Sequence, residues 1–245
     1  QRGSMAAVIR VITFDLPDPR ALGIPDAVTA LGNLPRGLVL VTGPAGSGKS
    51  TTLACIIDYI NETQEKHIIT MEDPLEFLHR HKKSIVSQRE ISSDTESYVV
   101  ALRASLRQSP DVILLGEMRD FETISIAMTA AETGHLVLST LHTPGAASTV
   151  DRIIDVFPPS QQRQIAVQLS TTLQAVVSQQ LIPSADGASM AAAFEMMTVT
   201  PAIRNMIREN KIPQIDGTIY SSASDTMFSM DSSLAALCRS GRISR

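Results

Sequence analysis

Residues 43–51 read GPAGSGKST, which fits the pattern G-x-x-x-x-G-K-[ST] of a loop that binds phosphate groups. An apolar run, LVLVT (38–42), precedes the loop, and a stretch with helical periodicity, STTLACIIDYINET (50–63), follows it. The pattern binds phosphate when it lies between a strand and a helix, because backbone N–H groups and the helix N-terminus then face the phosphate oxygens. The stretch therefore predicts a nucleotide site within an α/β fold.

The chemistry of the motif gives each part of the loop a role. We expect Lys49 to reach the β- and γ-phosphates, and Ser50 to ligate Mg²⁺ with Thr51 beside it. The alternative is an incidental glycine turn, which the flanking strand and helix disfavour. The predicted cofactors are ATP and Mg²⁺, and the predicted nucleotide-binding residues are Gly43, Pro44, Ala45, Gly46, Ser47, Gly48, Lys49, Ser50 and Thr51.

Three further apolar runs predict strands that are buried on both faces, because they do not alternate with polar residues. They read HIITM (67–71), VILLG (112–116) and LVLSTL (136–141). Segments with helical periodicity lie between them, at 95–108 and at 120–134, where Gly134 can end the helix. Alternating strands and helices predict a mostly parallel central sheet.

Acidic residues follow two of these predicted strands. IITMEDPLEF (68–77) places Glu72, Asp73 and Glu76 after one, and Glu117 ends the next. Because the carboxyl ends of parallel strands meet at one edge, we expect these side chains to face the phosphates and Mg²⁺. We predict Glu72 as the base that positions water, assisted by Asp73 and Glu76, and Glu117 as the acid on the metal side. The alternative for each is an ordinary capping or surface carboxylate.

Two histidines flank the predicted strand 136–141. His142 follows it, where a side chain can sense the γ-phosphate, and we include it among the catalytic residues. His135 precedes it and is included as a supporting residue. Seven residues of extended chain put the two about 23 Å apart, so they are not expected to reach one phosphate. The alternative for each is a hydrogen-bonded polar group without a role in catalysis.

The alternation of predicted strands and helices changes after residue 155. Pro158 and Pro159 break the chain, and a long helix is predicted beyond them. A strand is predicted at 191–197 (AAAFEMM), and a helix begins with Thr200 as N-cap and Pro201 in its first turn. The apolar face of the long helix is predicted to comprise Ile165, Leu169, Leu173, Val176 and Val177.

Composition limits the classes of function. The chain has 245 residues, and 43% are hydrophobic, which suffices for a sizeable core. Its net charge of -4 does not predict a broad basic surface for nucleic acid. The only cysteines, Cys55 and Cys238, form no C-x-x-C pair, so neither a zinc site nor a disulfide framework is predicted. No apolar run approaches the roughly 18 residues of a transmembrane segment.

Four motifs together resemble one family. GPAGSGKSTT, ITMEDPLEF (69–77), LLGEMRD (114–120) and TGHLVLSTLHT (133–143) are similar, in order and spacing, to the Walker A, aspartate box, Walker B and histidine box of the type II/type IV secretion ATPases. AIRNMIRE (202–209) resembles a motif of the pilus-retraction ATPases of twitching motility within that family. The resemblance implies a RecA-like core. It also implies a homo-hexamer in the full-length protein, located in the cytoplasm at the inner face of the membrane, with an inner-membrane platform protein of the pilus as partner.

The same resemblance implies that the segment 202–209 transmits force rather than hydrolyses ATP. From the residues alone, Ile203, Met206 and Ile207 form an apolar helix face, and Arg204 and Arg208 lie one turn apart on another. Because two arginines so close repel slightly, packing alone is not expected to select both. An amphipathic surface helix is the alternative. The predicted transmission residues are Ala202, Ile203, Arg204, Asn205, Met206, Ile207, Arg208 and Glu209.

The first residues, QRGSM, and the resemblance together predict a division of the chain. We expect residues 1–4 to be a cloning remnant, 5–35 a linker with part of an N-terminal domain, 36–183 the RecA-like core, and 184–245 a C-terminal helical region. The family carries a larger N-terminal domain that supplies arginines to a neighbouring subunit, so weak ATPase activity and poor hexamer formation are predicted for this chain. Arg103, Arg107 and Arg119 are alternative candidates for interface or phosphate contacts, or lie on solvated helix faces.

Three other functions are considered. A pilus-extension or type II secretion ATPase is the nearest alternative, although those relatives carry a tetracysteine zinc insertion that this chain lacks. A module that binds nucleotide and partner proteins without hydrolysis is the second. A DNA-translocating RecA-like protein is the third, and the charge balance disfavours it.

Overall fold

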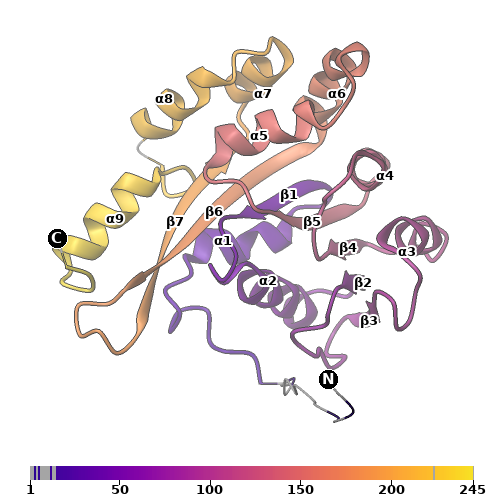
Figure 1. Ribbon diagram of the computed structural model, residues 1–245, viewed down its shortest axis with the longest axis horizontal. Helices are drawn as coiled ribbons and strands as arrows, with labels where there is room; N and C mark the ends of the chain where they lie inside the picture. Colours follow the sequence, from indigo (N-terminus) through magenta and orange to yellow (C-terminus); the bar gives the residue numbers. More distant parts are fainter. Residues whose placement is uncertain (1–2, 4, 6–11, 13–14, 223, 245) are drawn as a thin grey trace.

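A single twisted sheet organises the chain. The computed structural model describes residues 3, 5, 12, 15–222 and 224–244. Its seven-stranded sheet has the order β3-β2-β4-β5-β1-β6-β7, and only the β6–β7 pair is antiparallel (Figure 1). The strands are β1 (Gly37–Thr42), β2 (His67–Glu72), β3 (Ile85–Glu90), β4 (Val112–Leu115), β5 (Leu136–Leu141), β6 (Leu173–Pro183) and β7 (Met190–Thr198).

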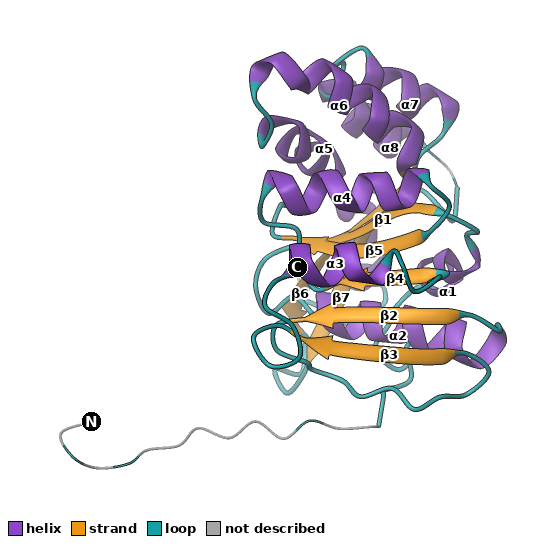
Figure 2. Cartoon of the chain, turned by 90° about the vertical axis from the view of Figure 1, so that its right-hand side faces the viewer, coloured by secondary structure: helices purple, strands orange, loops and turns teal. Residues whose placement is uncertain are grey.

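Helices cover both faces of this sheet. Helices α1 and α2 lie on one face, and α3 and α4 lie on the other, with α5–α8 stacked beyond α4 (Figure 2). A 3-10 turn, η1 (Ala30–Asn33), joins α1 to the sheet. The helices are α1 (Asp26–Thr29), α2 (Lys49–Thr63), α3 (Tyr98–Ser105), α4 (Phe121–Glu132), α5 (Ala146–Asp155), α6 (Pro159–Thr172), α7 (Pro201–Arg208), α8 (Pro213–Ser221) and α9 (Met230–Arg239).

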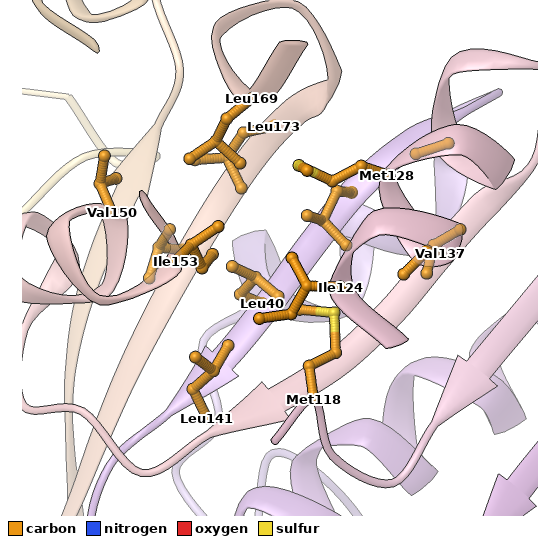
Figure 3. Close-up of a cluster of buried hydrophobic side chains, with 14 of the residues drawn as sticks. Leu40, Met118, Ile124, Met128, Val137, Leu141, Val150, Ile153, Leu169 and Leu173 are labelled. Atoms are coloured by element: carbon orange, nitrogen blue, oxygen red, sulfur yellow. The ribbon is translucent and has the colours of Figure 1, made fainter. Parts of the chain in front are cut away.

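The central strands divide their side chains between two hydrophobic cores. In β1, Leu40 packs into the core that contains α4 and α6, whereas Val39 and Val41 pack with α2. Figure 3 shows Leu40, Ile124 and Leu173 in the first of these cores. Because both faces are covered, these strands are apolar at nearly every position, which is why their sequences do not alternate.

The four strands predicted from apolar runs are confirmed as β1, β2, β4 and β5, and the strand predicted at 191–197 is confirmed as β7. The long helix predicted after Pro159 is wrong in its second half. Helix α6 ends at Thr172, and Leu173 begins β6, in which Val176 and Val177 pair with Leu40 and Val41 of β1. Their spacing fits a helix face, but a central strand also accepts consecutive buried residues.

The predicted boundary between residues 183 and 184 falls in the hairpin between β6 and β7. The segment after it therefore adds a strand to the central sheet, and helices α5 and α6 from before it join α7 and α8 in one helical layer. Most of the predicted cloning remnant and much of the segment 5–14 lie outside the described residues. Within the described residues, every helix is too short or too polar to cross a membrane.

Candidate functional site

The phosphate loop joins β1 to α2. Gly43 opens it with φ of 135°, and a Cβ at this position would lie 2.2 Å from the carbonyl oxygen of Gln179. Gly48 closes it as the N-cap of α2 in the left-handed conformation, with φ of 87°. Since glycine has no side chain to cap the helix, the first N–H groups of α2 remain directed at the loop. The backbone therefore has the shape and the polarity of an anion site.

Lys49 extends across this loop. Its Nζ donates hydrogen bonds to the carbonyl oxygens of Gly43 at 3.0 Å and Pro44 at 2.9 Å. It also lies 3.5 Å from Nδ1 of His142. Burial lowers the pKa of Lys49, and the negative charges of Glu117 and Glu76 oppose that shift. A triphosphate in this position would supply the counter-charge that this ammonium group lacks within the loop.

Glu117 and His142 continue this line of polar groups. Glu117 follows β4, and its side chain is 13% exposed. One of its carboxylate oxygens, Oε2, lies 3.3 Å from Nε2 of His142, and the other contacts the guanidinium group of Arg119. The imidazole of His142 therefore stands between the ammonium group of Lys49 and the carboxylate of Glu117. The structure thus brings the strand ends of β1, β4 and β5 to one site, as the parallel topology requires.

Glu72 ends β2 on the same edge. Its Oε1 accepts a hydrogen bond of 2.7 Å from the hydroxyl of Thr70, which holds the carboxyl group in place. Burial raises the pKa of Glu72, and hydrogen bonds from Thr70 and Gln88 reduce that shift. Asp73 and Glu76 are exposed and lie close by on the segment after the strand.

These groups line one cavity of about 560 Å³. Its volume lies within the range of ligand sites in proteins. Residues that sequence analysis did not single out also line it, among them Tyr98, Thr140 and Leu181. Burial, together with the nearby acids, raises the pKa of Tyr98 above its ordinary value. Of the predicted site residues, the cavity is lined by Ala45, Gly46, Gly48, Lys49, Ser50, Thr51, Glu72, Asp73, Glu76, Glu117 and His142.

His135, which was predicted as a supporting residue, does not line this cavity. Within the described residues, its contacts lie at the other end of β5. It precedes β5, whereas His142 follows that strand, so the two lie at opposite ends. Nδ1 of His135 lies 2.9 Å from the carbonyl oxygen of Ala130, near the end of α4. Of the arginine candidates, Arg119 reaches the site, whereas Arg103 forms an exposed ion pair with Glu122.

The predicted transmission residues form α7, in the helical layer. Thr200 caps the helix by accepting a hydrogen bond from the N–H of Ile203. Ile203 and Ile207 are fully buried, and Arg208 is exposed. The structure gives Arg204 a hydrogen-bonding role within the fold, beside the proposed role of the two arginines in transmission. The guanidinium group of Arg204 donates to the carbonyl oxygens of Ser170, Thr171 and Leu173, and to Oε1 of Gln174, where α6 passes into β6.

Fold and loop together define the class: the chain is a P-loop nucleotide-binding protein with a mostly parallel sheet. The family model described as "Type II/IV secretion system protein" matches residues 7–229. The chain belongs to this family, as its motifs indicated.

Two relatives match nearly the whole of this chain. The twitching motility protein of Neisseria gonorrhoeae is 52% identical over 238 residues, which cover 97% of this chain and 64% of the relative. The type IV pilus retraction ATPase PilT of Pseudomonas aeruginosa is 50% identical over 100% of this chain and 71% of its own length. A crystal structure of the pilus retraction motor PilT with bound ADP matches with a TM-score of 0.90 at 49% identity, over 96% of this chain and 66% of that one. The chain thus spans about two thirds of the length of these proteins.

Proposed function

We propose that this chain hydrolyses ATP as part of a motor that retracts a type IV pilus. The observation that carries the proposal is the row of Lys49, His142 and Glu117 along one cavity, with Glu72 on the same edge. This row lies in a chain that is 50–52% identical to a twitching motility protein and to a pilus retraction ATPase. The site supports the chemistry, and the relatives support the process.

The loop residues Gly43 to Thr51 are proposed to hold the triphosphate. Backbone N–H groups at the start of α2 face the cavity, and Gly48 leaves them uncapped. The Lys49 ammonium group would exchange loop carbonyl oxygens for β- and γ-phosphate oxygens. Because phosphate oxygens carry full negative charge, this exchange favours the bound nucleotide.

The residues present also fit a magnesium ion. Ser50 lines the cavity in the first turn of α2, and Glu117 faces it from the end of β4. The described part of the chain has no cluster of three or more His, Cys, Asp or Glu residues that would hold a metal alone. Mg²⁺ that shares its ligands with phosphate fits such a site, because this ion commonly binds few protein groups. When bound, it neutralises charge on the phosphate oxygens.

Glu72 is proposed to orient the attacking water and to accept its proton. Its carboxyl group is fixed by Thr70, and its raised pKa makes it a better proton acceptor than an ordinary carboxylate. Asp73 and Glu76 assist from the rim of the cavity. His142 would sense the γ-phosphate, because its imidazole lies between Lys49 and Glu117.

The assembly is part of the same proposal. The complete protein would act as a homo-hexamer in the cytoplasm, at the inner face of the membrane, and bind a platform protein of the pilus. The exposed residues of α7, Ala202, Asn205 and Arg208, offer a contact surface for transmission, together with Glu209 beyond its end. Nucleic acid is not proposed as a partner, because the net charge is -4.

Phosphate release tests the chemistry. Wild type should release phosphate from Mg-ATP, Lys49→Ala should not bind ATP, and Glu72→Gln should bind ATP and release phosphate about 10²–10⁴-fold more slowly. Binding without release by wild type would instead support the non-hydrolysing module.

Complementation tests the process. The complete gene that encodes this chain should restore fibre shortening in a retraction-deficient strain, and Arg208→Ala should lower that rescue with ATPase activity intact. Rescue of an extension-deficient strain instead would support the pilus-extension alternative.

A further inference from the structure

Gln179 is a buried polar residue that belongs to none of the motifs. It lies in β6, next to β1 in the sheet, and is 3% exposed. Its Oε1 accepts a hydrogen bond of 2.7 Å from the hydroxyl of Thr52, which is also fully buried in the first turn of α2. The interaction crosses 127 positions of sequence and joins a strand to the helix that the phosphate loop opens.

The same residue touches both ends of the loop. At its start, the Gln179 carbonyl oxygen lies where a Cβ on Gly43 would approach to 2.2 Å. At its end, the Gln179 side-chain Nε2 would lie 2.9 Å from a Cβ on Gly48. The backbone and the side chain of Gln179 therefore contact Gly43 and Gly48, the first and last glycines of the loop. The hydrogen bond from Thr52 holds the Gln179 side chain beside Gly48.

We propose that Gln179 is a positioning residue that holds the phosphate loop open in its anion-binding shape. A loop with three glycines loses much conformational freedom when it orders around phosphate. A brace that fixes both ends before the ligand arrives removes part of that entropic cost from the binding step. This inference rests on the proposed nucleotide site and assigns it a residue outside the P-loop motif.

The neighbouring residue provides a matched control. Gln180 has the same side chain, follows Gln179 in the same strand and points to the opposite face of the sheet. It is only partly buried and pairs with Ala193 of β7. A general weakening of β6 should appear in Gln180→Leu as well as in Gln179→Leu, whereas loss of the brace should appear only in the latter.

The test measures binding of fluorescent ADP and steady-state hydrolysis of ATP. Gln179→Leu, which keeps the volume but not the polar groups, should weaken ADP binding about three- to tenfold, the value of one or two neutral hydrogen bonds. Thr52→Val should have a similar effect, and the double variant should be no weaker than the stronger single variant, because both remove the same bond. Gln180→Leu should bind like wild type.

A split between the kinetic constants separates positioning from loss of structure. KM for ATP should rise in Gln179→Leu while kcat stays within about twofold of wild type, because saturating nucleotide restores the shape of the loop. A general structural defect would lower kcat and the melting temperature together.

Six outcomes decide whether Gln179 acts as proposed. Equal ADP binding by Gln179→Leu and wild type would overturn the inference alone, and so would equal weakening in Gln180→Leu. Should Gln179→Leu not fold, unchanged binding by Thr52→Val would overturn it and weakened binding would support it. Failure of wild type to bind ADP, or binding unaffected by Lys49→Ala, would overturn the proposed site and this inference with it.

Discussion

Burial opposes the charge on two side chains of the site, Glu72 and Lys49. It raises the pKa of the first and lowers the pKa of the second, so the fold would be more stable with both groups neutral. Charged groups that a fold holds against this penalty mark a site where function outweighs stability. The two residues therefore allow a test that separates catalysis from folding.

Replacement of Glu72 by glutamine should stabilise the protein at pH 8 and leave its stability almost unchanged at pH 4. The folded pKa lies above the ordinary value of 4.5, so the folded state binds more protons than the unfolded state between the two values, and stability falls as pH rises through that window. Glutamine keeps the acceptor for Thr70 and removes the charge. Thermal unfolding at both pH values measures the difference.

The matched variant is Glu76→Gln, which removes an exposed carboxylate from the same cavity. It should stabilise the protein at pH 8 less than Glu72→Gln does, because an exposed charge keeps its hydration. An equal gain for Glu72→Gln at pH 4 and pH 8 would contradict the burial argument.

Two glycines of the phosphate loop should respond differently to alanine. Gly46 has φ of 76° and no atom within 4 Å of the position that a methyl group would occupy, so Gly46→Ala should cost only the backbone strain of about 1–2 kcal/mol. Gly43→Ala adds a clash with the backbone oxygen of Gln179 at 2.2 Å, and should cost about 1–3 kcal/mol more. Urea unfolding without nucleotide compares the two, and equal losses would argue against close packing of the loop on β6.

Among the elements, apolar runs in the sequence predict the interior strands of the sheet, but they do not predict strands of mixed composition. Strands β1, β2, β4 and β5 are apolar runs because helices cover both faces. Strand β3 (IVSQRE) lies at the edge of the sheet and is apolar at only two positions, so no run marks it. Strand β6 resembles a helix in sequence because its first residues continue the apolar spacing of α6, and only pairing with β1 distinguishes the two.

The residues of the candidate site could be predicted where the strands that carry them could be predicted. Glu72, Glu117 and His142 could be predicted because each lies at the end of a predicted parallel strand or directly after it. Gln179 lies within a strand that was not predicted, and Tyr98 lies on helix α3, which covers one face of the sheet rather than following the end of a strand. For Gln179, the one local indication of a role was a glutamine within an apolar segment. Recognising it required the correct assignment of β6 as a strand.

The contact between α7 and α6 should depend on one of the two arginines of α7. Arg204→Ala removes hydrogen bonds to three carbonyl oxygens at the junction of α6 and β6 and should destabilise the protein by about 1.5–3 kcal/mol. Arg208→Ala alters an exposed side chain on the same helix and should change stability by less than about 0.5 kcal/mol. Chemical denaturation measures both variants.

Similar losses in Arg204→Ala and Arg208→Ala would contradict this assignment. The comparison also matters for function, since a motility defect in Arg204→Ala can arise from the fold, whereas one in Arg208→Ala points to a contact with another molecule.

At the scale of the whole molecule, the site opens at one edge of the sheet and carries an exposed arginine at its rim. The side chain of Arg119 is 70% exposed although it contacts the carboxylate of Glu117. An exposed ion pair of this kind contributes little to the stability of a single chain. In the proposed hexamer, this rim would be available to a neighbouring subunit.

Assemblies that contain both wild-type and inactive subunits should therefore lose ATPase activity more steeply than the fraction of inactive subunits predicts. When protein from the complete gene is mixed with its Lys49→Ala variant at constant total concentration, phosphate release should fall more steeply than the fraction of wild type. An inactive subunit would then impair its neighbours as well as itself. Light scattering should verify that both proteins assemble equally, and a linear decline would argue for independent subunits.

Helix α6 passes into β6 without any intervening residue, at Thr172 and Leu173. The strand then runs about 20 Å from the residues that Arg204 binds to Gln179 beside the phosphate loop, at the usual rise of about 3.3 Å per residue. A flexible linker between α6 and β6 would allow the helical layer to move without moving the strand. In the proposed motor, a displacement of the helical layer would therefore reach the phosphate loop through the backbone of β6.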